Sequence, residues 1–161
     1  MTGRTAIYNA RLLDPASGLD ANGGILIENG LITDIGVGIT KATTADVKID
    51  AKGKALAPGL IDLRVKTGEP GAENKETLET AGDAAAAGGV TTFIVMPDTD
   101  PVLDSVALVD FIKRRADSVA KVKVLPTGGL TIDLDGAKMS EIGLIKQAGA
   151  AFFTNGDNTV E

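Results

Sequence analysis

The 161-residue chain contains neither cysteine nor histidine. Without cysteine it forms no disulfide and offers no thiolate to zinc or to an iron–sulfur cluster. Without histidine it has no imidazole general base, no imidazole metal ligand and no Ser-His-Asp triad of its own. These two absences remove the commonest ligands and bases from the chemistry available to this chain.

Aromatic residues are scarce at 3%, and tryptophan is missing. The core must therefore be built from Ala, Val, Leu and Ile, and platforms for stacking nucleic-acid bases are not expected. A net charge of −6 also argues against nucleic-acid binding, which needs clustered Lys and Arg. No apolar stretch approaches the ~20 residues that span a bilayer. With 43% hydrophobic and 24% charged residues, the composition indicates a globular protein, and we expect it in the cytoplasm.

The first 57 residues have the pattern of a β-rich module. Asn29-Gly30 stands between two apolar runs and predicts a tight hairpin, because a type I′ turn needs positive φ at both central residues. Short alternating or apolar runs predict strands over residues 5–13, 24–28, 31–35, 47–50 and 55–57. We therefore assign residues 1–57 to one β-rich domain.

The pattern changes at Pro58-Gly59. Beyond it, apolar strands alternate with helical segments about every 30 residues, which predicts a parallel sheet with right-handed crossovers. The predicted strands are 60–65, 90–96, 122–125 and 150–153, and the predicted helices are 75–87, 104–119 and 138–148. An open doubly wound sheet and a (β/α)₈ barrel both fit this order. A barrel takes roughly 250 residues, so residues 58–161, with about four βα units, amount to half of one.

Ligands of both parallel folds bind at the carboxyl ends of the strands. Four segments occupy those ends here: 64–71, 96–101, 126–130 and 154–157. Their Pro, Gly, Asn and Asp residues are equally typical of plain turns, so both readings stay open. Lys113-Arg114-Arg115, near the end of a predicted helix, is expected to be a solvated basic end.

Several segments, taken together, resemble a known enzyme family. They are PGLIDLRVKTGEPG, KETLET, AAAAGGVTT, MPDTDP and FFTNGD, in that order. This order is similar to that of the dihydroorotases of the amidohydrolase superfamily, whose patterns are PGLID-x-H-x-H-x-R-EPG, KET-x-ET, AAAAGG-x-TT, MPNT-x-P and F-S-D-D-G. The resemblance covers essentially the whole chain.

The resemblance implies an architecture and an activity. It implies a (β/α)₈ barrel with a small β-sandwich built from both ends of the chain. Residues 1–57 would then be the first part of the sandwich and residues 58–161 the first half of the barrel, so that the chain looks like the N-terminal part of such a protein. Active members of the family hold one or two zinc ions and interconvert N-carbamoyl-aspartate and dihydroorotate in pyrimidine synthesis.

The residues that carry the family's chemistry are replaced in this chain. Arg64 and Lys66 stand where the family has the two metal-binding histidines of H-x-H, and Gly68 stands at the substrate-binding arginine. Asp98 replaces the substrate-contacting asparagine. Asn155 falls, by a less certain alignment, at the metal-bridging aspartate. We therefore assign no catalytic residue and no metal ligand, and we regard these five as degenerate positions of the family site.

The replacements oppose the family reaction on chemical grounds. Arg and Lys are cations without a lone pair for a metal, so they repel Zn²⁺. Without metal there is no bound water of lowered pKa to attack the amide carbon. No zinc or other cofactor is therefore expected. Arg64 and Lys66 are instead expected to pair with nearby carboxylates, so that ion pairs fill the former metal site; the candidates are Asp62, Glu69 and Asp98.

With the fold signature kept and the site lost, the chain most resembles the non-catalytic dihydroorotase-like proteins that partner aspartate transcarbamoylase. The resemblance implies a structural role in such a complex. Half a barrel also leaves apolar strand edges and helix faces uncovered, which predicts self-association or partner binding. Two alternatives remain open. One is a diverged cyclic-amide hydrolase completed by residues outside this chain, and the other is a small-anion binding module that uses Arg64 and Lys66.

Overall fold

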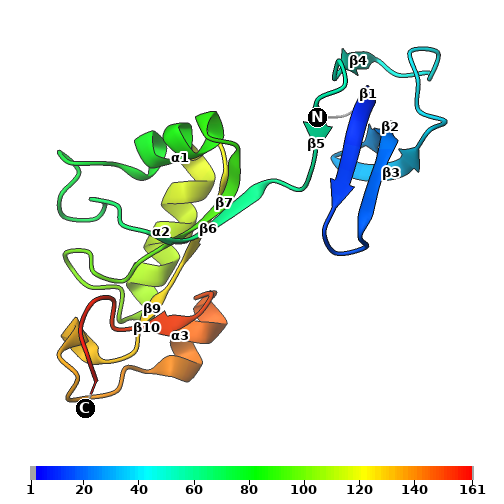
Figure 1. Cartoon of the computed structure of the whole chain (residues 1–161). Coiled ribbons are helices and arrows are strands. Elements are labelled where there is room, and N and C mark those ends of the chain that lie inside the picture. Colours follow the sequence, from blue (N-terminus) through cyan, green and yellow to red (C-terminus); the bar gives the residue numbers. More distant parts are fainter. Residues whose placement is uncertain (1–2, 161) are drawn as a thin grey trace. The chain divides into compact units, whose positions relative to one another are not determined.

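The structure, a computed structural model, describes residues 3–160. It divides the chain into two compact units, Met1–Pro58 and Gly59–Glu161 (Figure 1). The division falls at the Pro58–Gly59 peptide, where the sequence changes from short alternating runs to apolar strands separated by helices.

The first unit is a five-stranded sheet in which β1 is central. Its strands are β1 (Arg4–Asp14), β2 (Leu19–Glu28), β3 (Leu31–Gly36), β4 (Val47–Asp50) and β5 (Ala55–Leu56). The order is β3-β2-β1-β4, with β5 also on β1. The β1–β2 and β2–β3 pairs are antiparallel, and β4 and β5 run parallel to β1. The predicted β-rich N-terminal part is thus confirmed.

The β2–β3 hairpin turns at the predicted dipeptide. Asn29 and Gly30 have φ values of 51° and 80°, the left-handed conformation that the sequence indicated for a tight turn. Small apolar clusters, one around Leu26 and Ile39 and one around Leu12 and Ile25, hold this unit together.

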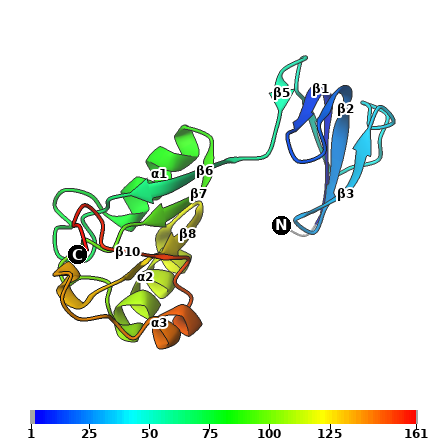
Figure 2. The same cartoon turned by 60° about the horizontal axis from the view of Figure 1, so that its bottom comes forward.

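The second unit contains the predicted parallel strands. Strands β6 (Leu60–Val65), β7 (Val90–Val95) and β8 (Lys123–Pro126) form a parallel sheet in the order β6-β7-β8 (Figure 2). A second parallel pair joins β9 (Gly128–Gly129) to β10 (Phe153–Thr154). The connecting helices are α1 (Leu78–Ala87), α2 (Val106–Val119) and α3 (Ile142–Ala148), with a short 3₁₀ helix, η1 (Ile132–Leu134).

The fourth predicted strand is shorter than expected and pairs differently. Instead of spanning 150–153, it covers only Phe153–Thr154 and pairs with β9 rather than β8. Thr127 separates β8 from β9, and its hydroxyl donates to the carbonyl of Val95 (2.7 Å). The backbone N–H of Ala151 still donates to the carbonyl of Pro126 (2.8 Å). Hydrogen bonds therefore continue beside the interruption, although the regular ladder is broken.

All three helices begin later than predicted, and at α1 and α3 side chains cap or hold the preceding backbone. The Thr77 hydroxyl accepts from the N–H of Thr80 (3.1 Å), and the Thr80 hydroxyl accepts from the N–H of Thr77 (3.0 Å), so the predicted helix 75–87 starts at Leu78. The predicted helix 138–148 starts at Ile142. Before it, Met139 forms a β-bridge with Thr131, and the Ser140 hydroxyl donates to the carbonyl of Gly129 (2.6 Å).

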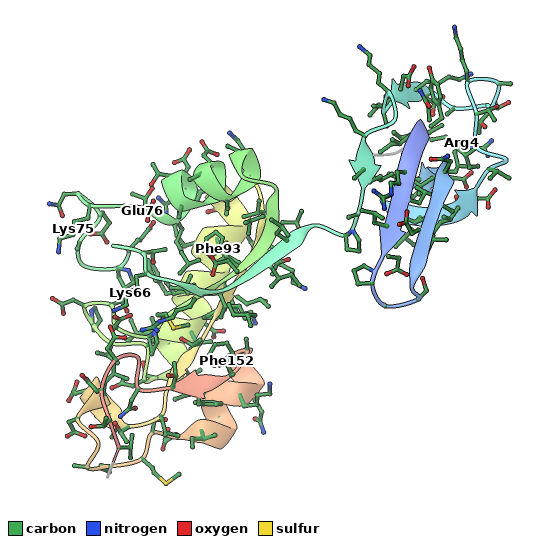
Figure 3. All side chains as sticks on the ribbon, viewed as in Figure 1. Arg4, Lys66, Lys75, Glu76, Phe93 and Phe152 are labelled. Carbon is green, nitrogen blue, oxygen red and sulfur yellow. The ribbon has the colours of Figure 1, made fainter. Side chains whose placement is uncertain are left out.

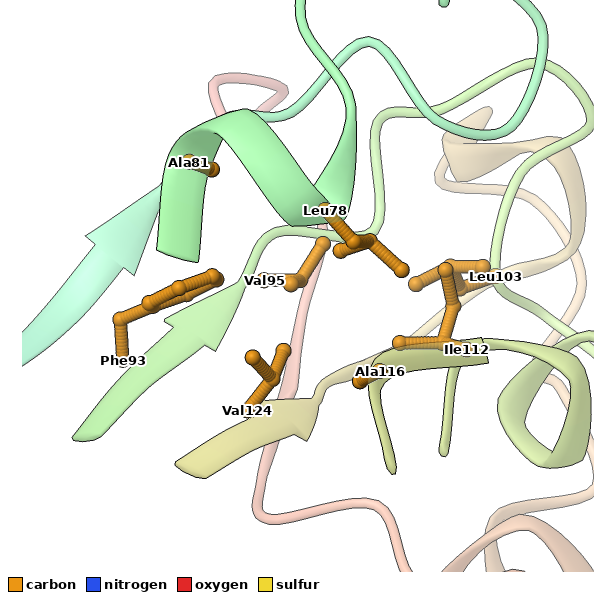
Figure 4. Packing of buried hydrophobic residues seen from close by; sticks show 8 residues of the cluster. All are labelled: Leu78, Ala81, Phe93, Val95, Leu103, Ile112, Ala116 and Val124. Atoms are coloured by element: carbon orange, nitrogen blue, oxygen red, sulfur yellow. The ribbon is translucent and has the colours of Figure 1, made fainter. Parts of the chain in front are cut away.

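Helices α1 and α2 pack on the same face of the β6-β7-β8 sheet. Phe93 and Val95, two residues apart on β7, are fully buried and point to that face. Figure 4 shows them within a cluster that also contains Leu78, Ala81, Leu103, Ile112, Ala116 and Val124. This core fixes the strands, so the loops at their carboxyl ends start from defined positions.

Candidate functional site

The loops at the carboxyl ends of the strands carry the polar residues that the sequence singled out. Arg64 lies near the end of β6 and Lys66 directly follows this strand; Asp98 and Asp157 lie in the loops after β7 and β10. Figure 3 places Lys66 among the loops at this end of the sheet. Because parallel strands end at one edge, residues far apart in the sequence meet here.

Four side chains form an ion-pair network that we call the strand-end cluster: Arg64, Lys66, Asp98 and Asp157. The Lys66 ammonium lies 2.6 Å from Asp98 Oδ2 and 2.6 Å from Asp157 Oδ2. The Arg64 guanidinium donates to Asp157 Oδ1. Two cations face two carboxylates, so the formal charge of the cluster is zero.

The structure contains one of the predicted pairings and adds a partner that the sequence reasoning missed. Lys66 pairs with Asp98 as predicted. Asp62 accepts a hydrogen bond from the backbone N–H of Arg64 (3.0 Å), and among the described residues it forms no ion pair with Arg64 or Lys66. Asp157 was not predicted, although it belongs to one of the four strand-end segments. The common edge of parallel strands was the signal that could have identified it.

The cluster alters the acid–base properties of two of its members. The pKa of Asp157 lies below its ordinary value of 3.8, mainly because Lys66 donates a hydrogen bond to it, and further because of the charges of Lys66 and Arg64. The pKa of Lys66 lies above its ordinary value of 10.5 because its ammonium donates to Asp157 and Asp98. Both groups are solvent-accessible, so their contribution to stability is small.

We expect the contribution of the Asp157 pairing to be present above pH 3.8 and to disappear as the pH falls through the lowered pKa of the folded state. That of Lys66 is present below pH 10.5 and disappears as the pH rises through its raised pKa. An NMR titration of the Asp157 carboxyl carbon measures the acid limb. Lys66→Met should return the midpoint toward 3.8, and an unchanged midpoint would contradict the assignment of the main cause.

Asn155 is a buried residue of the loop that follows β10, and its side chain bonds to Thr131 rather than to the strand-end cluster. Only 5% of it is exposed. Its Oδ1 accepts from the backbone N–H of Thr131 (3.0 Å), and its Nδ2 donates to the Thr131 hydroxyl (2.8 Å). Among residues 3–160, no hydrogen bond joins its side chain to Arg64 or Lys66. Asn155 thus ties the third and fourth strand-end loops together and is not part of the strand-end cluster.

Gly68 occupies a closed turn and not a side-chain position that faces the cluster. Its N–H donates to the carbonyl of Glu76 (3.1 Å), and its own carbonyl accepts from the N–H of Ala72 (2.5 Å). A Cβ added here would lie 2.7 Å from the Glu76 carbonyl oxygen and would also collide with that of Ala72. The backbone therefore leaves no room for a side chain at this position.

Glu69 takes a role that differs from the predicted one. Its carboxylate is buried, with 5% of the side chain exposed. It does not pair with Arg64 or Lys66; it accepts from the backbone N–H of Leu78 (2.8 Å) and from Arg115 Nε (2.6 Å). Glu69 therefore joins the first strand-end loop to the start of α1 and to α2.

The basic run on α2 is not simply a solvated helix end, as the sequence suggested. Arg115 binds the buried carboxylate of Glu69. Lys113 donates to the carbonyl of Ala148 (2.6 Å), at the end of α3. Two of its three cations thus hold neighbouring elements together, a use that depends on packing and has no local sequence signal.

The donors present at the strand ends do not fit a zinc ion. Lys66 and Arg64 offer only N–H groups, and these already bind oxygens of Asp98 and Asp157. Within residues 3–160 no group of three or more His, Cys, Asp or Glu side chains is arranged to hold a metal ion. A zinc site needs several lone-pair donors converging on one point.

Among residues 3–160, no helix has the length and apolar character needed to cross a bilayer.

Comparisons with known proteins identify relatives over most of the chain. Residues 53–161 match the family model described as "Dihydro-orotase-like". The chain is 42% identical over 152 residues to a dihydroorotase of Wolbachia sp. subsp. Drosophila simulans (strain wRi), covering 94% of this chain and 34% of that protein. It is 43% identical over 155 residues to a dihydroorotase of Syntrophotalea carbinolica, covering 96% and 36%. The chain thus spans about a third of the length of the curated relatives it matches.

Among solved structures, an L-hydantoinase (dihydropyrimidinase) from Arthrobacter aurescens superimposes with a TM-score of 0.81 at 30% identity. The match covers 92% of this chain and 32% of that one. The predicted fold class is confirmed: a β-rich segment is followed by parallel βα units of the (β/α)₈ amidohydrolase type. The family match, the two relatives and the shared fold lead to one conclusion: this chain belongs to the dihydro-orotase-like family.

Proposed function

We propose that this chain is a non-catalytic dihydroorotase-like protein connected with pyrimidine biosynthesis, whose role is structural, in a complex with an aspartate transcarbamoylase-type protein. The strand-end cluster carries the proposal. Where the family resemblance places two imidazole ligands, this chain has two cations, and both are bound to carboxylates. Family membership and the relatives' names support the pyrimidine context, and the cluster supports the loss of activity.

The family reaction needs an activated water and a carboxylate-binding cation. A metal ion supplies the first by lowering the pKa of bound water. Here the carboxylate lone pairs beside positions 64 and 66, on Asp98 and Asp157, already bind the Lys66 ammonium. The cation that would bind the substrate carboxylate has no counterpart, because Gly68 is closed to any side chain. Neither requirement is met at the family positions that this chain contains, which supports the proposed loss of activity.

The two alternatives have less support. A small-anion module would need Arg64 and Lys66 to be available, but each is paired with a carboxylate of the chain itself. A bound anion would have to displace Asp157 and leave that carboxylate without its partners. A diverged hydrolase would need ligands from outside the chain to overcome two local positive charges.

We expect the purified chain to contain no stoichiometric zinc and to hydrolyse no dihydroorotate above a protein-free blank. Elemental analysis after purification without chelators measures the metal, and an absorbance assay of dihydroorotate measures turnover. An active dihydroorotase assayed in parallel with added zinc is the control. Stoichiometric zinc that is lost on changing Arg64 or Lys66, or metal-dependent turnover, would overturn the proposal in favour of the diverged hydrolase.

We also expect association through β6, one of the two edge strands of the β6-β7-β8 sheet. Leu60, Ile61 and Leu63 are 61–62% exposed there, which is unusual for apolar residues of a parallel strand. Light scattering over a concentration series should detect self-association. Co-purification should detect binding to an aspartate transcarbamoylase-type protein from the same genome. The double variant Ile61→Lys/Leu63→Lys should weaken self-association and partner binding. Met139→Lys, at an exposed position outside β6, should weaken neither. A monomer that binds no such partner would contradict the structural role.

A further inference from the structure

Two carboxylates from different loops converge on one ammonium group. Asp98 follows β7 and Asp157 follows β10, 59 positions later in the sequence, yet one oxygen of each lies 2.6 Å from Lys66 Nζ. These two oxygens are therefore no more than twice that distance apart. Asp98 has 29% of its side chain exposed, and Lys66 is its ion-pair partner among the described residues.

An oxygen pair that shares a cation in this way is also what a hard divalent cation binds. Calcium and related ions take carboxylate oxygens at roughly 2.3–2.6 Å and complete their shell with water. We propose that the Lys66 ammonium is the resident cation between Asp98 and Asp157 and excludes a divalent cation from this position. This inference rests on the proposed function, in which the chain has no family-type metal centre. It adds that Lys66 is the side chain that keeps a divalent cation out.

The charges explain why Lys66, rather than Arg64, is the excluding group. Among residues 3–160, Arg64 forms an ion pair with Asp157 alone, whereas Lys66 forms one with each of the two carboxylates. Removing the ammonium leaves the two carboxylates of Asp98 and Asp157 with one cation of the cluster, the Arg64 guanidinium, which pairs with Asp157. Coulomb energies of about 1 kcal/mol per charge pair at 4 Å in water then favour an incoming dication over no ion.

The donor set also indicates the class of cation that would enter. The anionic donors of the cluster are the carboxylate oxygens of Asp98 and Asp157, and the chain contains neither a cysteine thiolate nor a histidine imidazole. Oxygen-only sites suit Mg²⁺, Ca²⁺ and Mn²⁺. Mn²⁺ is the most useful probe, because its unpaired electrons broaden the NMR signals of nearby amides.

The experiment titrates Mn²⁺ into the isotopically labelled wild-type chain and into Lys66→Met. Selective broadening of the amides around Asp98 and Asp157 should appear in Lys66→Met at a concentration at least about tenfold lower than in the wild type. Lys66→Arg keeps the positive charge and should behave as the wild type. Lys121→Met makes the same charge change at an exposed pair with a single carboxylate, Asp83, and should gain no site.

The outcomes separate this inference from the proposed function. Stoichiometric zinc in the wild type would overturn both. A metal-free wild type together with a Lys66→Met variant that gains no Mn²⁺ binding would overturn the inference and leave the proposed function standing. Equal broadening in Lys66→Met and Lys121→Met would also overturn it, because net charge alone would then suffice. Lys66→Gln provides the same test if Lys66→Met does not give the spectrum of a folded protein.

Discussion

Arg115→Met is expected to lower the free energy of unfolding by about 2–3 kcal/mol, because it leaves the buried carboxylate of Glu69 without its charged partner. The expected loss in the free energy of unfolding is smaller than for a fully buried ion pair, because 39% of the Arg115 side chain is exposed. Of the two donors to its carboxylate among residues 3–160, Glu69 would keep the N–H of Leu78. Urea unfolding followed by circular dichroism measures the loss.

The matched control is Lys121→Met, which breaks an ion pair whose two side chains are 69% and 48% exposed. Its expected cost is below about 0.5 kcal/mol. The double variant Glu69→Gln/Arg115→Met should recover part of the loss, since it removes the uncompensated charge. Equal losses in Arg115→Met and Lys121→Met would mean that the buried position of Glu69 contributes nothing to the strength of its pair.

Gly68→Arg is expected to destabilise the chain by about 3 kcal/mol or more, because its Cβ would collide with the backbone oxygens of Ala72 and Glu76. The turn must open before any side chain fits. Gly143→Ala, in α3 with open space around it, is the control and should be neutral or slightly stabilising. Thermal unfolding of both variants measures the difference.

The same collision bears on a reversion of the family site. We expect the five-fold variant with Arg64→His, Lys66→His, Gly68→Arg, Asp98→Asn and Asn155→Asp to bind zinc weakly at most and to turn over no dihydroorotate. The backbone at position 68 has no room for an arginine side chain. The side chain at position 155 bonds to Thr131, so it is not directed at the strand-end cluster. Metal-dependent turnover by this variant, assayed against the wild-type blank, would mean that these residues suffice for the chemistry.

Sequence patterns predicted the elements well where the signal was local. The Asn29-Gly30 turn and the alternation of apolar strands with helices follow from steric and periodic rules that act over a few residues. The parallel pairing of β6 with β7 then follows from that alternation, because a strand–helix–strand connection returns the chain to the same end of the sheet. The start of α1 was misplaced because the Thr77–Thr80 capping box, and not helix propensity, sets it. The fourth strand was misjudged because its partner changes at Thr127.

The sequence by itself determined that the site lacks imidazole ligands and carries cations at positions 64 and 66, because these are properties of residue type that no fold can alter. Only the tertiary structure decided which anions those cations meet. Lys66 and Asp157 are 91 residues apart, and their contact depends on two strands ending at one edge. Glu69, closer in sequence, is instead turned into the interior by its bonds to Leu78 and Arg115. Sequence distance does not encode side-chain direction, so the choice among neighbouring carboxylates is made by packing.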